Sequence, residues 1–223
     1  MGAIMNNETS IITQRRLLAR KSDDPNYRKQ REELIAAAAR VFRRKGFQAA
    51  KLQDIAEEVG KNRITLYYYT SGKDELFQEI VAAVVAGNVE MVEKLYSEDL
   101  PSTHKLRYLC TRLMASYEAH YPYLFVYIQE PMTQLDDSTE WGLMMKSLQG
   151  RFDEATKGII RQGIEDGSFR ISSSHITMIA NAILGMLHWS HRWFQLEKGM
   201  SGESIGVIFA DLVLNGLATS RSD

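Results

Sequence analysis

The stretch that decides the fold runs from Leu52 to Lys73 and reads LQDIAEEVGKNRITLYYYTSGK. Four of its apolar residues recur at i, i+3, i+4 and i+7 and share one face of a short helix, namely Leu52, Ile55, Ala56 and Val59. Gly60 comes next, where a helix C-terminus adopts the left-handed backbone that glycine tolerates best. Asn62 is suited to cap a following helix, so the chain is predicted to turn sharply between two helices.

The second helix is predicted over residues 63–69 and is short, polar and aromatic. It buries Leu66 and leaves four residues largely outside, namely Arg63, Thr65, Tyr67 and Tyr68. A helix, a glycine turn and a short second helix make up a helix-turn-helix, whose second helix enters the DNA major groove. Alternatively, the three consecutive tyrosines are half-buried aromatics with solvated hydroxyls, and at least one of them is expected to be so.

The side chains of this stretch have the chemistry of a DNA contact surface. The Arg63 guanidinium matches guanine O6 and N7, and the Gln53 amide matches adenine. Other residues carry donors that phosphate oxygens accept, namely Thr65, Tyr67, Tyr68 and Lys73. The predicted partner of this stretch is therefore double-stranded DNA.

The segment IAEEVGKNRITLYYYTSGKDELF resembles the signature of the TetR family of bacterial regulators, I-A-x-x-x-G-x-S-x-x-T-L-Y-x-H-F-x-x-K-x-x-L. The residues in register are Ile55, Ala56, Gly60, Thr65, Leu66, Tyr67, Lys73 and Leu76. The departures are Lys61, Ile64, Tyr69 and Thr70, and they place the target sequence beyond the reach of the resemblance. Lys51 stands where the family often has a threonine that caps the helix and contacts phosphate. With the resemblance, the predicted DNA-contacting set is Lys51, Gln53, Lys61, Asn62, Arg63, Thr65, Tyr67, Tyr68 and Lys73.

Composition favours a helical chain of the reducing cytoplasm. The 223 residues are 44% apolar with four prolines, and they contain no strand alternation or internal repeat. The single cysteine, Cys110, excludes an internal disulfide and a multi-thiolate metal site. No apolar run approaches the roughly 20 residues of a membrane span, and the N-terminus lacks a signal-peptide core. We therefore expect a cytoplasmic protein with no membrane partner.

Charge is distributed unevenly along the chain, although the net charge is only −1. Residues 27–73 hold eleven Lys or Arg against five Asp or Glu, a net of +6, whereas residues 74–223 hold twelve against twenty, a net of −8. A basic DNA-binding module followed by an acidic body would show this distribution. The predicted domains are a flexible basic N-terminal arm (1–26), a helix-turn-helix DNA-binding domain (27–73) and a ligand-binding and dimerisation domain (74–223). The arm either reaches into a minor groove or is a solvated tail.

Helical periodicity covers most of the chain outside the arm. Beside the two short helices, helices are predicted over residues 27–45, from an opening at 71–75 to about 96, from after 101 to a break at 121–122, and over 123–132, 141–165, 173–196 and 202–218. The predicted fold is all-α, with an N-terminal three-helix helix-turn-helix head and a larger helical body. The three-helix head is too small to be very stable alone, so it is expected to depend on the body.

The body is rich in methionine and aromatic residues, which at helical spacing usually form ordinary core. Helical bundles also enclose small-molecule sites that have a few polar anchors. The predicted ligand contacts are Tyr117, Phe125, Gln129, Trp141, Met145, Asn181, His188 and Trp189, and for the polar ones a satisfied core or surface group is the alternative. Residues 184–194, LGMLHWSHRWF, resemble a TetR subgroup with an R-W-Y/F pattern, several members of which respond to acyl-CoA thioesters. That resemblance implies an apolar effector and a homodimer through the last two helices, which form a four-helix bundle across a two-fold axis.

No catalytic, metal or cofactor constellation stands out. His188 and His191 are three residues apart but have no third ligand, Cys110 has no oxyanion site beside it, and phosphate-binding glycine loops are missing. We therefore predict no cofactor, no metal and no enzymatic activity. The predicted function is a DNA-binding repressor that a small, largely apolar effector, such as an acyl-CoA thioester, releases from a palindromic operator. The alternative is a helical ligand carrier or enzyme that retains a non-functional head.

Overall fold

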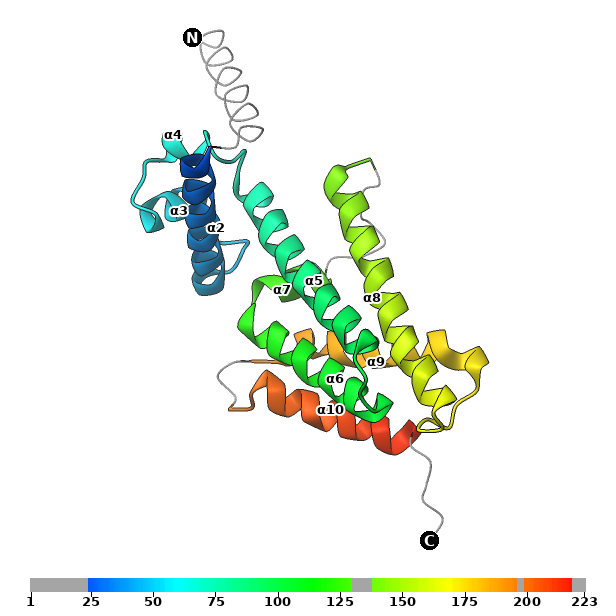
Figure 1. The fold of residues 1–223 in the computed structure, drawn as a ribbon. Helices are drawn as coiled ribbons and strands as arrows, with labels where there is room; N and C mark the ends of the chain where they lie inside the picture. Colours follow the sequence, from blue (N-terminus) through cyan, green and yellow to red (C-terminus); the bar gives the residue numbers. More distant parts are fainter. Residues whose placement is uncertain (1–23, 130–137, 196–198, 218–223) are drawn as a thin grey trace. The chain divides into compact units, whose positions relative to one another are not determined.

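The computed structural model describes residues 24–129, 138–195 and 199–217 (Figure 1). Its helices are α2 (Pro25–Lys45), α3 (Leu52–Glu58), α4 (Arg63–Leu66), α5 (Lys73–Ser97), α6 (Ser102–Ala119), α7 (Tyr123–Gln129), α8 (Glu140–Glu165), α9 (Ile176–Trp189) and α10 (Gly202–Leu217). Short 3-10 turns at Ser173–His175 and Ser190–Arg192 flank α9. The described residues contain no β-strand, so the prediction of an all-α fold is confirmed. Residues 1–23 of the predicted basic arm lie outside the described part of the chain.

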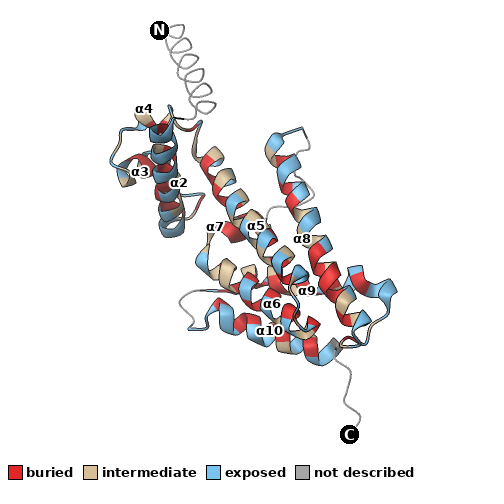
Figure 2. Ribbon diagram, in the orientation of Figure 1, coloured by how far each residue is buried: buried red, intermediate tan, exposed pale blue. Residues whose placement is uncertain are grey.

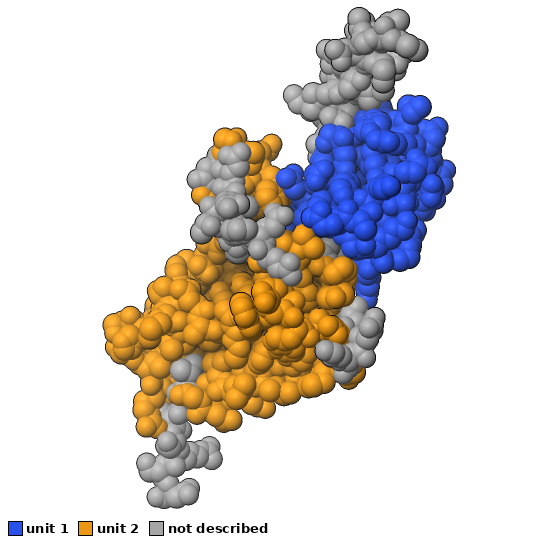
Figure 3. Space-filling view, turned by 180° about the vertical axis from the view of Figure 1, so that it is seen from behind, with its two compact units in different colours: residues 1–82 blue, residues 83–223 orange. Residues whose placement is uncertain are grey.

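The chain divides into two compact units, Met1–Ala82 and Ala83–Asp223, which Figure 3 colours separately. Unit 1 contains α2, α3, α4 and residues 73–82 of α5, and unit 2 contains the rest of α5 and the later helices. The start of α5 belongs to unit 1 because Leu76, Phe77, Ile80 and Val81 are buried in its core. The predicted domain boundary after residue 73 stays a prediction.

Unit 1 is built around an aromatic and aliphatic core. The helix α2 begins two residues earlier than predicted, because Asp24 accepts a hydrogen bond from the backbone N–H of Asn26 at 2.9 Å. It ends at Gly46, whose φ is 75°, and the chain folds back so that the Phe47 ring lies 4.1 Å from that of Phe77. Ile55 of α3 and Leu66 of α4 are fully buried in the same core. Both short helices are therefore held by apolar packing within unit 1.

Unit 2 is a helical bundle in which α10 packs closely along α6 (Figure 1). A Cβ atom added at Gly202 would lie 2.3 Å from the carbonyl oxygen of Met114, and one at Gly206 would lie 2.5 Å from the Cα of Thr111. Ala210, four residues later, is fully buried. These small residues let the two backbones approach more closely than larger side chains would allow.

Several predicted helix ends differ from the structure or lie outside its described part; the helix predicted over 63–69, for example, forms as α4 only to Leu66. The helix predicted over 173–196 forms as α9 only to Trp189, because the chain then turns to bury Phe194, whose N–H donates to the Ser190 carbonyl at 2.8 Å. The Phe194 ring packs 5.8 Å from that of Phe125. The last residues of the helix predicted over 123–132 lie outside the described residues.

Burial follows the helical period in the long helices of unit 2, which bury one face and expose the other (Figure 2). None of the helices in the described ranges is long and apolar enough to cross a membrane.

Candidate functional site

The turn between α3 and α4 ends one helix and caps the next. Gly60 has a φ of 66°, and the N–H of Lys61 reaches back to the carbonyl of Ala56 at 2.9 Å, which is the bond of a Schellman helix end. Asn62 then caps α4, because its side-chain oxygen accepts from the backbone N–H and from the hydroxyl of Thr65, both at 2.8 Å. The predicted glycine turn and asparagine cap are confirmed.

The helix α4 presents polar, apolar and aromatic side chains to solvent. Leu66 has no exposed surface, whereas Arg63 and Tyr68 are exposed. The Arg63 Nη2 atom donates to the hydroxyl of Tyr67 at 2.9 Å, and this guanidinium lies 5.7 Å from the centre of the same ring. These contacts hold the Arg63 and Tyr67 side chains together on the exposed side of α4.

Ile64 is a candidate DNA contact that was not among the nine predicted ones. Its side chain is 74% exposed, the largest exposed fraction among the large hydrophobic residues of the described chain. The signal was its position two residues from the buried Leu66, because such a spacing places residues on opposite sides of a helix. An exposed apolar side chain beside Arg63 is suited to contact the methyl group of thymine.

The three consecutive tyrosines have different environments. Tyr69 stacks on Tyr27 with ring centres 5.3 Å apart. Burial raises the pKa of the Tyr69 phenol, and Tyr68, Tyr27 and Asp24 raise it further by smaller amounts. Tyr68 touches the edge of Tyr27 but keeps 37% of its surface exposed. The expectation that at least one tyrosine is a half-buried packing residue is confirmed for Tyr69.

Arg31 of α2 holds the end of α4 in place. The residue is only 7% exposed, and its guanidinium donates to the backbone carbonyl of Tyr69, to Glu75 at 3.1 Å and to Glu79. These bonds join α2, the turn after α4 and the start of α5. Arg31 was not among the predicted site residues, because a single arginine among the charges of α2 cannot be singled out until its distant partners are known.

Two of the predicted DNA-contacting lysines are engaged within unit 1. The Lys73 ammonium donates to the backbone carbonyls of Phe47 and Ala50 at 2.9 and 3.0 Å, and it lies 4.6 Å from the centre of the Phe47 ring. The Lys61 ammonium donates to the side-chain oxygen of Gln30. Their contacts with phosphate stay predictions, and the contacts observed for Lys73 support a role in holding the loop between α2 and α3.

Lys51 and Gln53 lie exposed at the start of α3. The backbone N–H of Lys51 donates to Asp54 at 2.8 Å, and the Lys45 ammonium donates to the same carboxylate at 2.7 Å. These bonds, that of Lys45 first, hold the pKa of Asp54 below its usual value. Eight of the nine predicted DNA contacts therefore lie on α3, α4 and their adjoining loops, and the ninth, Lys73, is the first residue of α5; all are in unit 1, and which of them touch DNA stays a prediction.

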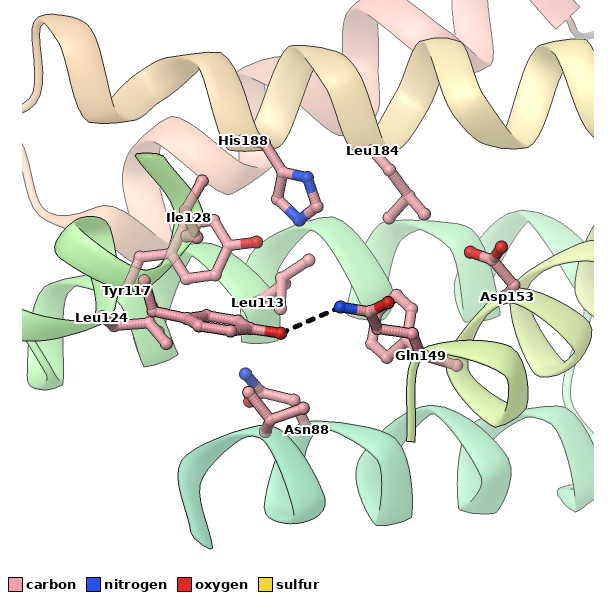
Figure 4. Close-up of a pocket in the computed structure, with 12 residues that line it drawn as sticks. Asn88, Leu113, Tyr117, Leu124, Ile128, Gln149, Asp153, Leu184 and His188 are labelled. Atoms are coloured by element: carbon pink, nitrogen blue, oxygen red, sulfur yellow. Dashed lines mark hydrogen bonds between the residues drawn. The ribbon is translucent and has the colours of Figure 1, made fainter. Parts of the chain in front are cut away.

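Unit 2 contains a cavity of about 160 Å³ with a mainly apolar lining (Figure 4). Residues from α5, α6, α7, α8 and α9 contribute to it. Its apolar and aromatic lining consists of Val85, Leu113, Tyr117, Leu124, Tyr127, Ile128, Phe152 and Leu184. Its other lining residues are Asn88, Gln149, Asp153 and His188.

Two of the predicted ligand contacts, Tyr117 and His188, line this cavity. Phe125 is buried with its ring 5.7 Å from that of Tyr117, so it packs behind the lining. The others do not line the cavity in the described chain: Trp141 packs against Tyr127, Met145 is fully buried, and Asn181 and Trp189 are exposed. The side chain of Gln129 lies outside the described residues. The assignment of all eight to a ligand site stays a prediction.

Two of the titratable groups that line the cavity, His188 and Tyr117, are uncharged. Burial, with a smaller contribution from His191, lowers the pKa of His188 to about 4, so its imidazole is neutral at physiological pH. Burial also raises the pKa of Tyr117, which keeps its phenol protonated. The amide nitrogen of Gln149 donates to the hydroxyl of Tyr127 at 3.0 Å, as Figure 4 shows.

Neither the cysteine nor the histidine pair forms a reactive site in the described chain. Burial raises the pKa of Cys110 to about 12, so its thiol stays protonated and acts as a packing group. The Nδ1 atom of His191 contacts the backbone carbonyl of His188 at 2.8 Å. Among the described residues, no three His, Cys, Asp or Glu side chains are placed to hold a metal ion.

The helix-turn-helix of unit 1 and the helical unit 2 with its mainly apolar cavity are the features of a helix-turn-helix transcriptional regulator. The model of bacterial regulatory proteins of the tetR family matches residues 34–80, and the model of the tetracyclin repressor-like C-terminal domain matches residues 99–217. The chain belongs to the TetR family.

Individual proteins of the family are similar along most of the chain. The repressor KstR2 of Mycolicibacterium smegmatis is 26% identical over 200 residues, which cover 87% of this chain and 93% of that protein. The crystal structure of the TetR family regulator PfmR from Thermus thermophilus matches with a TM-score of 0.70 and 30% identity, covering 83% of this chain and 99% of PfmR. The structure of KstR2 from Mycobacterium tuberculosis matches with a TM-score of 0.71 and 20% identity, covering 90% and 98%.

Proposed function

We propose that this TetR-family chain is a cytoplasmic repressor that binds a palindromic operator as a homodimer and leaves it when a small, largely apolar effector binds. The observation that carries the proposal is the exposed surface of α4, where Arg63, Ile64 and Tyr68 face solvent on a backbone held by Asn62 and Arg31. In the proposed complex, Arg63 contacts guanine and Lys51 and Tyr68 contact phosphates.

The proposed dimer forms through the last two helices, α9 and α10. Large apolar side chains are exposed along them and on the segment that joins them, namely Met178, Trp189, Trp193, Met200, Val207, Ile208 and Leu212. A set of exposed apolar residues of this size on neighbouring elements supports a protein interface. A two-fold dimer implies an operator with half-site centres about 34 to 36 Å apart, or a multiple of this distance.

The proposed effector enters the cavity of unit 2. That cavity, at about 160 Å³, is close in size to a dry cavity of roughly 150 Å³ that binds benzene in another protein. An apolar ring or a short stretch of acyl chain therefore fits it. The resemblance of residues 184–194 to an acyl-CoA-responsive subgroup makes acyl-CoA thioesters one class of effector to test.

The helix α5 is the proposed route between ligand and DNA. Its residues Val85 and Asn88 line the cavity. Its residues Glu75 and Glu79 accept hydrogen bonds from Arg31, and Arg31 also donates to the backbone carbonyl at the end of α4. An effector that displaces α5 therefore changes the separation of the two α4 helices in a dimer. To change operator occupancy from nearly full to nearly none, it must prefer the released state by about 5.5 kcal/mol.

The DNA-binding proposal is tested by mobility shifts of the full-length protein with fragments of its source genome, followed by footprinting. We expect a symmetric footprint, an affinity that falls steeply with salt, and a loss of specific binding in Arg63→Ala. Arg161→Ala is the matched control, because it removes the same charge from an exposed position of α8. If no fragment is shifted at low salt while small ligands still bind, the chain is a ligand carrier and the proposal fails.

A further inference from the structure

Three polar side chains of the cavity have no hydrogen-bond partner among the described residues. Asp153 of α8, Asn88 of α5 and His188 of α9 come from three different helices and line the same space. Figure 4 shows His188 and Asn88 pointing toward one another across the cavity, with Asp153 beside Leu184 at its other end. A mainly apolar cavity that contains unpaired polar groups is suited to a ligand that supplies their partners.

The charge of the lining limits what this ligand can be. The twelve residues of its described lining include one carboxylate, Asp153, and no lysine or arginine. His188 adds no positive charge at neutral pH, because burial lowers its pKa to about 4. A carboxylate or phosphate group in this cavity would meet the charge of Asp153 without a cation to balance it.

The chemistry of Asp153 favours a hydrogen-bond donor. An ionised carboxylate only accepts hydrogen bonds, and its bonds to charged donors are stronger than those between neutral groups. Asp153 is half-buried and has neither an ion pair nor a hydrogen bond in the described chain, in contrast to its neighbour Glu154, which pairs with Lys157 at 3.2 Å. Asn88 and His188 can each both donate and accept, so they tolerate a wider range of ligand groups.

We propose that the effector cavity selects compact apolar molecules that carry a hydroxyl or a protonated amine, and that Asp153 accepts the hydrogen bond of this donor. The inference rests on the proposed function only in calling the ligand an effector. The apolar body of the ligand packs between Leu113, Leu124 and Leu184, and anionic molecules of the same size are rejected.

The test uses four molecules that share one ring and differ in one group: benzylamine, benzyl alcohol, benzoate and toluene. Calorimetric titration into the full-length protein is expected to give binding in the order amine, alcohol, toluene, with benzoate weakest. In Asp153→Asn, the Kd for benzylamine should rise about ten- to a hundred-fold, since a bond to a charged acceptor is lost. Glu154→Gln is the matched control, because it removes a charge from the adjacent exposed residue and should leave all four Kd values unchanged.

Several results would overturn the inference. These are the same benzylamine Kd in the wild type and in Asp153→Asn, benzoate binding as tightly as benzylamine, or no binding by any of the four molecules. If Asp153→Asn does not fold, as judged by its thermal melting, the order of benzylamine and benzoate on the wild-type protein decides the question alone.

A mobility shift with a genomic operator fragment, run on the same samples, separates this inference from the proposed function. Selective amine or alcohol binding by a protein that shifts no DNA would support the cavity assignment and reject the repressor. A protein that shifts its operator but does not distinguish the four molecules would support the repressor and reject the role of Asp153.

Discussion

The polar groups of α4 and its supports in unit 1 differ from those of the cavity in unit 2. In unit 1, Arg31, Lys73 and Asn62 have their bonds satisfied by backbone carbonyls, carboxylates or N–H groups of the same unit. In unit 2, Asp153 and His188 line a cavity without a hydrogen-bond partner in the described chain. The difference is that the polar groups around α4 are held by partners within the same unit, whereas these two polar side chains of the cavity are open to a partner from outside the chain.

The difference also has an energetic meaning. A satisfied polar network stabilises one arrangement of the backbone, and removal of one member leaves its partners unpaired. Under the proposed function, a ligand that binds the folded cavity stabilises unit 2 in proportion to its occupancy.

Acid should destabilise the protein through His188. Its folded-state pKa is lowered to about 4, so on acidification the unfolded chain takes up a proton at this residue while the folded chain does not. The contribution of His188 to the free energy of unfolding is therefore fully present above the unfolded pKa of about 6.5. It is lost as the pH falls toward 4, and the loss from this residue alone is roughly 3 kcal/mol. Urea denaturation of the wild type and of His188→Gln at several pH values measures this difference. His104→Gln, which changes an exposed histidine, should follow the wild type, and parallel pH curves for all three proteins would contradict the prediction.

Replacement of Arg31 should destabilise unit 1 strongly. Arg31→Met removes the guanidinium that donates to Glu75, to Glu79 and to the Tyr69 carbonyl. We expect a loss of about 2 to 3 kcal/mol, at the low end for a broken buried pair because Glu79 is 37% exposed. Urea unfolding followed by circular dichroism is the measurement.

The matched control for Arg31 is Arg40→Met on the same helix. Arg40 pairs with Glu58 at 2.8 Å, but its side chain is 57% exposed. Its replacement should change the stability by less than about 1 kcal/mol. Equal losses of stability in the two variants would show that the buried ion pairs of Arg31 contribute no more than the exposed ion pair of Arg40.

Lys73→Met distinguishes an internal role of this residue from a phosphate contact. We expect a loss of about 1 to 2 kcal/mol in stability, because a charged donor to the carbonyls of Phe47 and Ala50 is removed. Operator affinity should fall, but the slope of log K against log salt should stay the same. A slope reduced by about one would instead show that Lys73 binds a phosphate. Lys51→Met, at an exposed position, is the comparison in which the reduced slope is expected.

Ile64→Ala should have the smallest effect on stability and a selective effect on DNA. The side chain is exposed, so the free energy of unfolding should change by less than about 0.5 kcal/mol. Operator affinity should fall about five-fold if Ile64 contacts a thymine methyl, while binding to unrelated DNA stays constant. Competition titrations with operator and random duplexes measure the ratio, and an equal fall for both duplexes would argue against a base contact.

Features that depend on residues close together in the chain were predictable. The amphipathic period of α3, the glycine turn at Gly60 and the cap at Asn62 each involve residues no more than a few positions apart, and each was found as predicted. The contrast between the buried Leu66 and the exposed Arg63 follows from the same local period. The end of α9 was not predictable in this way, because the turn at Ser190 depends on where Phe194 finds its aromatic partners.

The candidate sites were predictable only in part, for the same reason. Tyr117 and His188 were selected from composition and do line the cavity, but Asp153 and Asn88 carried no signal among the many charged and polar residues of their helices. A lining drawn from five helices exists only once those helices are packed together.

The amino-acid sequence by itself determined the helices, the helix-turn-helix and membership of the TetR family, because helical period, caps and the family motif are local patterns. Only the tertiary structure decided which polar groups are satisfied. Arg31 meets the carbonyl of Tyr69 across 38 positions, and Lys73 meets that of Ala50 across 23. Partners so far apart are chosen by the burial of whole helix faces, and that burial is a property of the packed molecule rather than of any segment.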